Sequence, residues 1–316
     1  MTLVIGTDEA GYGPNLGPLV VAATAWRLDA RPEAVEHRLA RVAEEAGRLA
    51  PGGRLWGDSK MIYRGGSGFE GLERGVLVAL AVAGQGRPPT WRDLIARLAA
   101  DGSEPTTAPP EQASLEALSL PRHQATDACL DLDADVESRL AATGIQLEAI
   151  RCRLVQPAEF NQLLDEGLNK SDILSRITLD LAARLAALGR DEPVAIWCDR
   201  HGGRRRYAAQ VARAFDTPLV QPLEETARCS RYACGAGRTI EFSVAGESRL
   251  PVAVASMTAK YLRELSMQAF NSHWGSRQAG LRPTAGYPVD AVRWRAEGAA
   301  AVESAGTIWD AVWRRA

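Results

Sequence analysis

Apolar residues at the start of the chain follow the pattern of buried β-strands. Residues 2–7 (TLVIGT) form a short apolar run that ends in an acidic, glycine-rich turn, and residues 19–26 (LVVAATAW) form a second run bounded by Gly17 and Pro18. Such runs, bounded by turn residues, predict strands, and their spacing permits a hairpin. Leucine, valine and alanine at helical spacing then predict a helix near 32–49.

Helical and strand patterns alternate in the second half of the chain. Residues 147–156 alternate like a half-buried strand, and residues 193–199 (PVAIWCD) form a continuous apolar run typical of a buried central strand. This alternation indicates an α/β fold, a mixed sheet with helices on both faces. The remaining expected elements are helices at 169–188 and 204–214, a strand at 217–222, a hairpin within 229–246, a helix from Pro251 to about 272, and a C-terminal helical segment at about 288–316.

A stretch at about 64–145 differs in composition from the rest of the chain. Loop signals occur at 65–68 (GGSG), 87–89 (RPP) and 105–110 (PTTAPP). We interpret the stretch as an insertion or lid, outside the core, in an otherwise single domain. Between its loops we expect helices at 69–83, 91–100 and 133–142.

Composition narrows the classes of protein. The chain has 316 residues, a length that suits one long domain or two, and its net charge is −2, which excludes a strongly basic nucleic-acid wrapper. It does not exclude a nucleic-acid enzyme with a local basic surface. The five cysteines form no CxxC pair, so neither a disulfide framework nor a zinc site is suggested. No basic leader and no run of roughly 18 apolar residues occurs, so we expect a cytoplasmic protein without a membrane span.

Two neighbouring acids end the first predicted strand. Adjacent strand residues point to opposite faces, so Asp8 and Glu9 can serve one site only if the chain turns there, as Gly11 and Gly13 would allow. Two acids beside exposed glycine amides fit a divalent-metal site that handles phosphate. The alternative is a solvated turn with two ordinary acids.

Other candidate residues follow later strands. Asp199 ends the buried run, where α/β sheets place functional groups, although an aspartate there can also cap a helix. Four arginines follow within 200–206 and could hold phosphate or be solvated. Glu247 precedes the long helix and could simply favour its dipole. Ser256, Lys260 and Arg263 are expected near one face of that helix.

The basic residues are unusually biased, with 34 arginines and three lysines. An excess of this kind is typical of a GC-rich coding sequence, in which surface lysines become arginines at little cost. The three remaining lysines, Lys60, Lys170 and Lys260, would then mark places where a compact ammonium cannot be replaced by a guanidinium. Retention by chance is the alternative.

Five ordered segments resemble type 2 ribonucleases H, the RNase HII/HIII family. They are GTDEAGYGPNLGPLVVAA, GDSK, WCDRHGG, GESRLPVAVASMTAKYLREL and GYPVDAVRWRA. The resemblance covers the expected core but not the 64–145 stretch. It implies an RNase H-like fold with a mixed five-stranded sheet. It also implies four metal-binding carboxylates: Asp8, Glu9, Asp199 and Glu247.

The same resemblance implies substrate contacts. Gly11, Tyr12 and Gly13 match the segment that reads the 2′-hydroxyl through its backbone, and Tyr287 matches a tyrosine that packs on the sugar. The other positions are Asp58, Ser59 and Lys60 of the DSK motif, Ser256 and Lys260 of the long helix, and Asn169 and Lys170, a looser match.

The implied reaction is hydrolysis of RNA in RNA–DNA hybrids, or at ribonucleotides embedded in duplex DNA. Two Mg²⁺ or Mn²⁺ ions would serve it, with 5′-phosphate and 3′-hydroxyl products. Tyr12 departs from the family's usual arginine and Glu247 from its usual aspartate. The alternatives are a nucleic-acid-binding relative with weak or no cleavage, or an actin-like ATP phosphotransferase, for which only one convincing phosphate loop is found.

Overall fold

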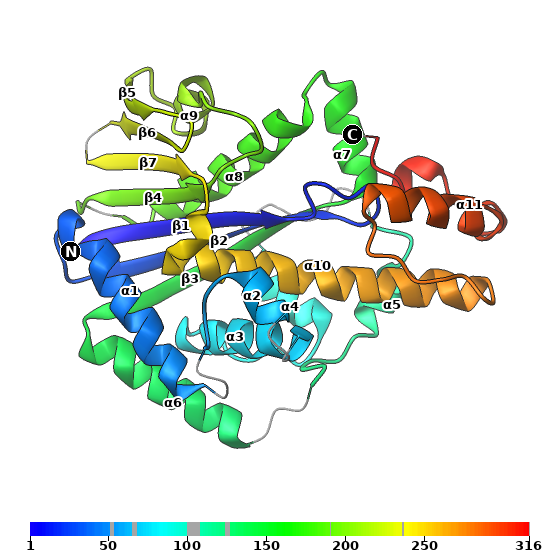
Figure 1. Ribbon diagram of the computed structural model, residues 1–316, viewed down its shortest axis with the longest axis horizontal. Coiled ribbons are helices and arrows are strands. Elements are labelled where there is room, and N and C mark those ends of the chain that lie inside the picture. Colours follow the sequence, from blue (N-terminus) through cyan, green and yellow to red (C-terminus); the bar gives the residue numbers. More distant parts are fainter. Residues whose placement is uncertain are drawn as a thin grey trace.

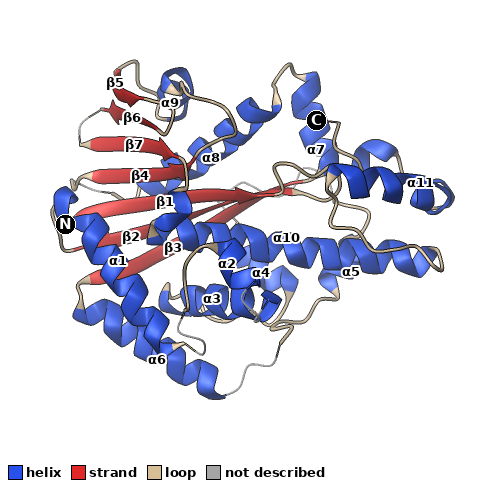
Figure 2. Cartoon of the chain, in the orientation of Figure 1, coloured by secondary structure: helices blue, strands red, loops and turns tan. Residues whose placement is uncertain are grey.

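The computed structural model describes residues 1–50, 54–64, 68–99, 108–123, 127–189, 191–235 and 237–315. These residues form an α/β fold with one twisted sheet and helices on both of its faces (Figures 1 and 2). Its strands are β1 (Thr2–Ala10), β2 (Leu19–Leu28), β3 (Ile145–Val155), β4 (Val194–Asp199), β5 (Val220–Glu225), β6 (Cys229–Cys234) and β7 (Arg238–Ser243).

Most of the helices lie between β2 and β5 in the sequence, and the last two follow β7. They are α1 (Pro32–Leu49), α2 (Ser59–Arg64), α3 (Gly68–Val82), α4 (Trp91–Leu98), α5 (Gln112–Glu116), α6 (Asp127–Ala142), α7 (Pro157–Asp165), α8 (Lys170–Ala186), α9 (Ala208–Ala214), α10 (Leu250–Arg277) and α11 (Pro288–Ser304), with short 3₁₀ turns η2 (Gly246–Ser248) and η3 (Trp309–Ala311). None of the helices within the described ranges is both long and apolar enough to cross a membrane.

The sheet has the strand order β3-β2-β1-β4-β7-β6-β5. Strands β1, β4 and β7 run parallel to one another, and the other neighbours pair antiparallel. The predicted class, a mixed sheet with helices on both faces, is confirmed, but the count of five strands is wrong. The hairpin expected within 229–246 forms as β6 and β7, and β5 pairs with β6. The described residues therefore form seven strands, because this side of the sheet continues beyond β7.

Both faces of the central strands are buried. In β1, Val4 faces a core cluster that includes residues of α1, α3, α6 and α10, whereas Leu3 and Ile5 face a cluster that includes α8 and α9. Burial on both faces explains why β1, β2 and β4 are apolar runs without polar alternation. The sheet therefore supplies a rigid central layer between two layers of helices.

A glycine allows α10 to begin directly against β1. A Cβ atom on Gly6 would lie 2.2 Å from the Pro251 carbonyl carbon and 2.4 Å from the Val252 nitrogen. The Thr24 hydroxyl of β2 donates to the Pro251 carbonyl at 2.8 Å. These contacts fix the start of α10 next to the strands that carry the first acids, and the α-helix predicted from Pro251 extends to Arg277.

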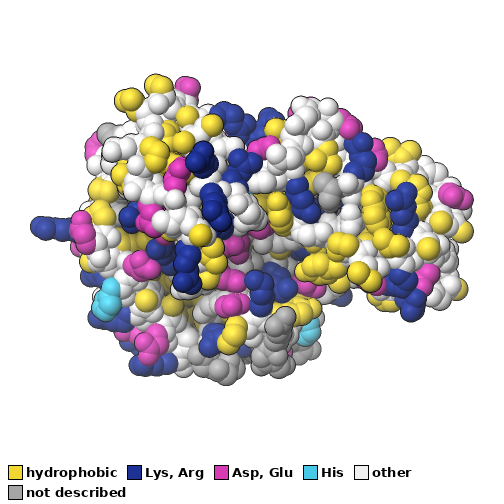
Figure 3. All heavy atoms as spheres, turned by 45° about the horizontal axis from the view of Figure 1, so that its top comes forward, with side chains coloured by type: hydrophobic (Ala, Val, Ile, Leu, Met, Phe, Trp, Pro, Cys, Tyr) yellow, Lys and Arg dark blue, Asp and Glu magenta, His cyan; other side chains and the backbone are white. Residues whose placement is uncertain are grey.

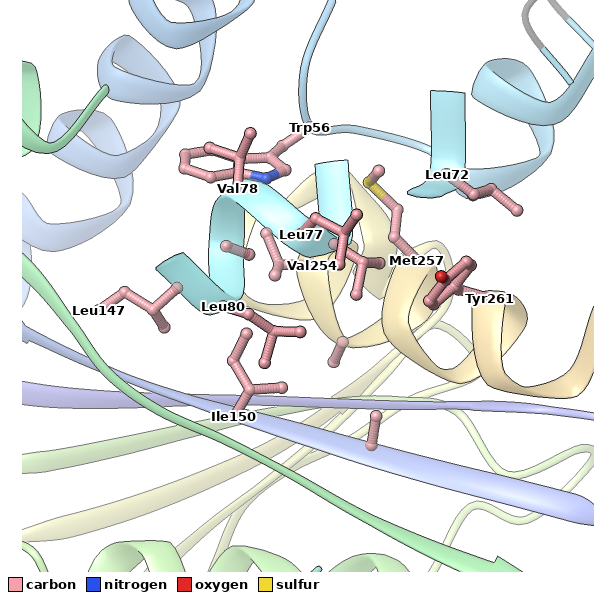
Figure 4. Packing of buried hydrophobic residues seen from close by; sticks show 14 of the residues in the cluster. Trp56, Leu72, Leu77, Val78, Leu80, Leu147, Ile150, Val254, Met257 and Tyr261 are labelled. Carbon is pink, nitrogen blue, oxygen red and sulfur yellow. The ribbon is translucent and has the colours of Figure 1, made fainter. Parts of the chain in front are cut away.

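The stretch at 64–145 contributes to the core, contrary to the interpretation as a lid. Leu72, Val76 and Leu80 of α3 are fully buried, and α3 packs on α10 in the largest core cluster. Figure 4 shows Leu77 and Leu80 of α3 facing Val254 and Ile150. The loop signals of the 64–145 stretch at 65–68 and 105–110 fall partly outside the described residues. The helices expected within the stretch form as α3, α4 and α6.

Two local predictions differ from the structure. Helix α9 begins at Ala208 rather than at residue 204, so all four arginines within 200–206 lie in the loop between β4 and α9. Helix α7 was not predicted; Pro157 occupies its first turn, where a missing amide hydrogen costs nothing. The C-terminal helical segment forms as α11 and η3. It builds a third apolar cluster with Leu16 and the second half of α10.

Candidate active site

Three parallel strands bring acidic residues to one edge of the sheet. Asp8 and Glu9 are near the end of β1, Asp199 ends β4, and Glu247 lies in η2, directly after β7. Thr7 pairs with Cys198, so the register sets Asp8 beside Asp199. The carboxyl ends of parallel strands are where α/β sheets hold ligands. All four carboxylates line one cavity of about 360 Å³.

The turn expected at the two first acids occurs later. Strand β1 continues through Ala10, and the chain turns at Gly11, whose φ is +86°. A Cβ atom there would lie 2.6 Å from the Pro18 carbonyl oxygen, so a side chain fits neither the backbone nor the space. Asp8 and Glu9 nevertheless line the same cavity, because it surrounds the end of the strand.

Burial and mutual repulsion raise the pKa values of three of these acids. Burial, and then the charge of Asp199, raises the pKa of Asp8 to about 8. Burial and the neighbouring Asp8 hold the pKa of Glu9 well above its usual value. Burial also raises the pKa of Asp199, although the Gly246 amide, which donates to its Oδ1 at 2.9 Å, opposes this effect. Asp199 thus accepts from the η2 turn rather than capping a helix.

Glu247 is held by residues from two other elements. Lys60 Nζ donates to its Oε1 at 3.1 Å, and the hydroxyl of Ser256 donates to its Oε2 at 3.2 Å. The Ser59 hydroxyl lies 3.5 Å from the same Oε2 and 3.1 Å from the Ser256 hydroxyl. The bond to Glu247 raises the pKa of Lys60, so this lysine remains charged within the acidic cavity.

The acids do not form a finished metal cage. Within the described ranges, no group of three or more His, Cys, Asp or Glu side chains is arranged to hold a metal ion. The donor chemistry nevertheless suits a hard divalent cation, since the cavity offers carboxylate oxygens whose repulsion a cation would relieve. Asp8, Glu9, Asp199 and Glu247 are the residues that would hold such an ion.

Most of the predicted substrate residues reach this cavity. Those that line it are Gly11, Tyr12, Ser59, Lys60, Ser256, Lys260 and Tyr287. Gly13 is exposed and open, since a Cβ atom added there would have no heavy atom within 4 Å. Asp58 caps α2 instead, because its Oδ1 accepts from the Lys60 amide at 2.8 Å and from the Met61 amide at 3.2 Å.

The loosely matched pair at the start of α8 lies just outside the cavity lining. Asn169 is the N-cap of α8 and accepts from the Ser171 and Asp172 amides in a capping box. Lys170 Nζ lies 4.8 Å from the centre of the Tyr12 ring. Burial and the charge of Arg314 lower the pKa of Lys170.

The arginines at 204–206 have different environments. Arg204 is bound to Asp172 and donates from Nε to the Ser171 hydroxyl at 2.9 Å, so it serves the start of α8. Arg205 and Arg206 are exposed. Figure 3 shows lysine and arginine side chains gathered in the central part of one face, with acidic groups between them.

One side of α10 supplies lining residues that sequence reasoning missed. Glu264, Met267, Gln268 and Asn271 continue the row that Ser256 and Lys260 begin. Steps of three and four along a helix keep residues on one face, so extending the row from Ser256 would have found them. Thr284 and Ala285, in the loop before α11, carried no such signal.

Comparisons with known proteins find similar structures but no similar sequences. No family model matches the chain, and no curated protein matches it. RNase HII of Archaeoglobus fulgidus, in its complex with PCNA, has a TM-score of 0.43 and 14% identity over 99% of this chain and 94% of that one. Ribonuclease H2 of Pyrococcus horikoshii OT3 has a TM-score of 0.43 and 16% identity, and the match covers 98% of this chain and 92% of that one. Bst-RNase HIII, in complex with Mn²⁺, has a TM-score of 0.42 and 13% identity, and the match covers 99% of this chain and 66% of that one.

Proposed function

We propose that the protein is a metal-dependent endoribonuclease that hydrolyses RNA in RNA–DNA hybrids or at ribonucleotides embedded in duplex DNA. The observation that carries this proposal is the convergence of Asp8, Glu9, Asp199 and Glu247 on one cavity. The sequence resemblance to type 2 ribonucleases H supports it independently of that geometry. The products would carry a 5′-phosphate and a 3′-hydroxyl.

The acids would hold two Mg²⁺ or Mn²⁺ ions. When bound, such ions activate water for attack and stabilise the leaving oxygen of a phosphodiester. The residues of the chain would do the rest. The carboxylates at the ends of β1 and β4 would bind the positively charged ions. Ser59, Ser256 and Lys60 hold the Glu247 side chain in place. Lys60 then neutralises part of the charge of a phosphate that enters the cavity.

Selection of RNA would come from the part of the cavity lining that follows β1. The backbone after β1, at Gly11 and Tyr12, lines it beside Tyr287 from the start of α11. The 2′-hydroxyl is the group that distinguishes a ribonucleotide from a deoxyribonucleotide, and backbone amides can bind it. The Tyr287 ring, which is exposed, is available to pack against a sugar.

The test is cleavage of three labelled duplexes: one with a single ribonucleotide, one long RNA–DNA hybrid, and one all-DNA control, each with Mg²⁺, with Mn²⁺ and with chelator. We expect ion-dependent cleavage of a ribonucleotide substrate only. Asp8→Asn should abolish it, and the exposed Glu44→Gln of α1 should not. Binding of the same duplexes without any cleavage would favour the non-catalytic alternative.

A further inference from the structure

The end of the chain packs on the loop that follows β1. Leu16 forms an antiparallel bridge with Trp313. The Arg314 amide donates to the Asn15 carbonyl at 2.7 Å, and the Asn15 side-chain amide donates to the Arg314 carbonyl at 3.0 Å. The last described residues consequently lie beside α7 and the β1–β2 loop (Figure 1). Residues almost 300 positions apart thus form one local structure.

The Arg314 side chain is buried against this loop without an acidic partner. It is 1% exposed, and its Nη2 donates to the Gly11 carbonyl at 2.6 Å and to the Pro14 carbonyl. Its guanidinium lies 5.1 Å from the centre of the Phe160 ring. Among the described residues, no carboxylate pairs with it, and its Nε and Nη1 have no hydrogen-bond partner. A buried charge without a counter-ion is costly, so general stabilisation is a poor explanation for it.

Arg314 sets the direction of two peptide groups. In a trans peptide, the carbonyl of one residue and the amide of the next point in opposite directions. Arg314 binds the Pro14 carbonyl, and the Asn15 amide accordingly points the other way and donates to the Gly286 carbonyl at 2.8 Å. By the same geometry, its bond to the Gly11 carbonyl turns the Tyr12 amide away from Arg314. Gly11 and Tyr12 line the acidic cavity.

A second buried arginine fixes the other side of the same loop. Arg263 of α10 donates to the carbonyls of Pro18 at 2.7 Å and of Leu16 and Ala285, each at 3.1 Å. It therefore joins the β1–β2 loop to the segment that carries Tyr287. The loop is held by α10 at its end and by the C-terminal tail at its start.

We propose that Arg314 is a positioning residue that holds the segment 11–14, here called the reading loop, with the Tyr12 amide turned toward the ribose. The proposal rests on the proposed function, in which this loop distinguishes RNA from DNA. The C-terminal tail thus belongs to the substrate-selecting part of the protein. Arg314 acts through the Gly11 and Pro14 carbonyls and does not touch the substrate.

The test compares Arg314→Met and Arg314→Lys with the matched control Arg315→Met. Arg315 belongs to the same tail but pairs with Asp165 and Asn161, away from the reading loop. One readout is amide hydrogen exchange over residues 11–18 in the free protein. The other is kcat and KM on a duplex with one ribonucleotide, with the Kd for the all-DNA duplex measured in parallel.

For Arg314→Met we expect faster exchange over 11–18 and a kcat about tenfold lower or more, because small misplacements near a reacting group cost this much. The all-DNA Kd should stay within about twofold, since DNA binding depends mainly on phosphate contacts. Arg314→Lys keeps the charge but loses the fork, so its kcat should fall between those of Met and wild type. Arg315→Met should match wild type in every readout.

Unchanged exchange and unchanged kcat in Arg314→Met would overturn the proposal. A parallel loss of kcat and of all-DNA binding would also overturn it, because that pattern indicates general damage. If Arg314→Met does not fold, the same two readouts on Arg314→Lys decide the matter. Failure of the wild type to cleave any ribonucleotide substrate would overturn the proposed function, whereas the exchange measurement would still report whether Arg314 holds the loop.

Discussion

His201 makes the stability of the protein depend on pH in a calculable way. The ring is 1% exposed, its Nδ1 lies 2.9 Å from the Ser175 hydroxyl, and Tyr207 and Phe242 face it edge-on with ring centres 5.5 Å and 5.3 Å away. Burial, and then the charge of Arg204, lowers the pKa of His201 from 6.5 to about 3. The folded protein therefore favours the neutral ring.

The sign and size of the effect follow from linkage. The folded pKa is lower than the unfolded one, so the stabilisation is complete above pH 6.5 and is lost as the pH falls toward 3. Each pH unit in that window corresponds to about 1.4 kcal/mol. Acidification to pH 5 should thus remove about 2 kcal/mol of unfolding free energy through this residue.

The assay is urea unfolding of the wild type and His201→Asn at pH 7.5 and pH 5.0. Asparagine has no titrating group, so the wild type should lose about 2 kcal/mol more than the variant between the two pH values. The raised pKa values of Asp8 and Glu9 act in the opposite direction but are present in both proteins and cancel. Equal pH dependence in both proteins, within about 0.5 kcal/mol, would show that His201 does not cause the loss of stability in acid.

Three further predictions concern the sheet edge and its acids. Gly6→Ala should destabilise the protein by about 3 kcal/mol or more, because the added Cβ would overlap the backbone of α10. Gly275→Ala, in α10 and in open space, should stabilise the protein by up to about 1 kcal/mol. Urea midpoints measure both changes. Asp8→Asn should abolish cleavage yet raise the unfolding free energy at pH 7, by at most about 4 kcal/mol, because folding no longer requires Asp8 to take up a proton that the unfolded chain releases; an unchanged or lower midpoint would contradict this. Glu247→Gln should weaken Mn²⁺ binding measured by calorimetry and slow cleavage; no change in either would remove Glu247 from the ligand set.

Much of the fold could be predicted because its signals are local. The apolar runs of β1, β2 and β4 and the helical spacing in α8 identify their elements wherever they pack. The count of five strands came from the resemblance, whereas the local patterns already predict a strand at 217–222 and a hairpin within 229–246. The bounds of β5 could not be predicted in this way, because it is largely exposed, contains Pro222 and is defined by pairing with β6 over Val220–Glu225. Likewise, only the packing of α3 against α10 shows that it belongs to the core.

Some residues of the candidate site could likewise be predicted from local signals, and others could not. Strand ends made Asp8, Glu9 and Asp199 visible in the sequence, since parallel strands deliver their carboxyl ends to one edge. The roles of Lys60 and Arg314 depend on partners far away in the chain, Glu247 and Gly11, and no local pattern predicts such pairs.

The central claim is that four acids of one cavity serve cleavage at ribonucleotides. Its most direct test is a duplex with a single embedded ribonucleotide, incubated with wild type or Asp8→Asn protein in Mg²⁺, in Mn²⁺ and in chelator, with the product ends analysed. We expect cleavage by the wild type only, dependent on the ion, leaving a 3′-hydroxyl and a 5′-phosphate. Cleavage that persists in chelator or in Asp8→Asn, or no cleavage of this duplex and of a long hybrid with either ion, would contradict it.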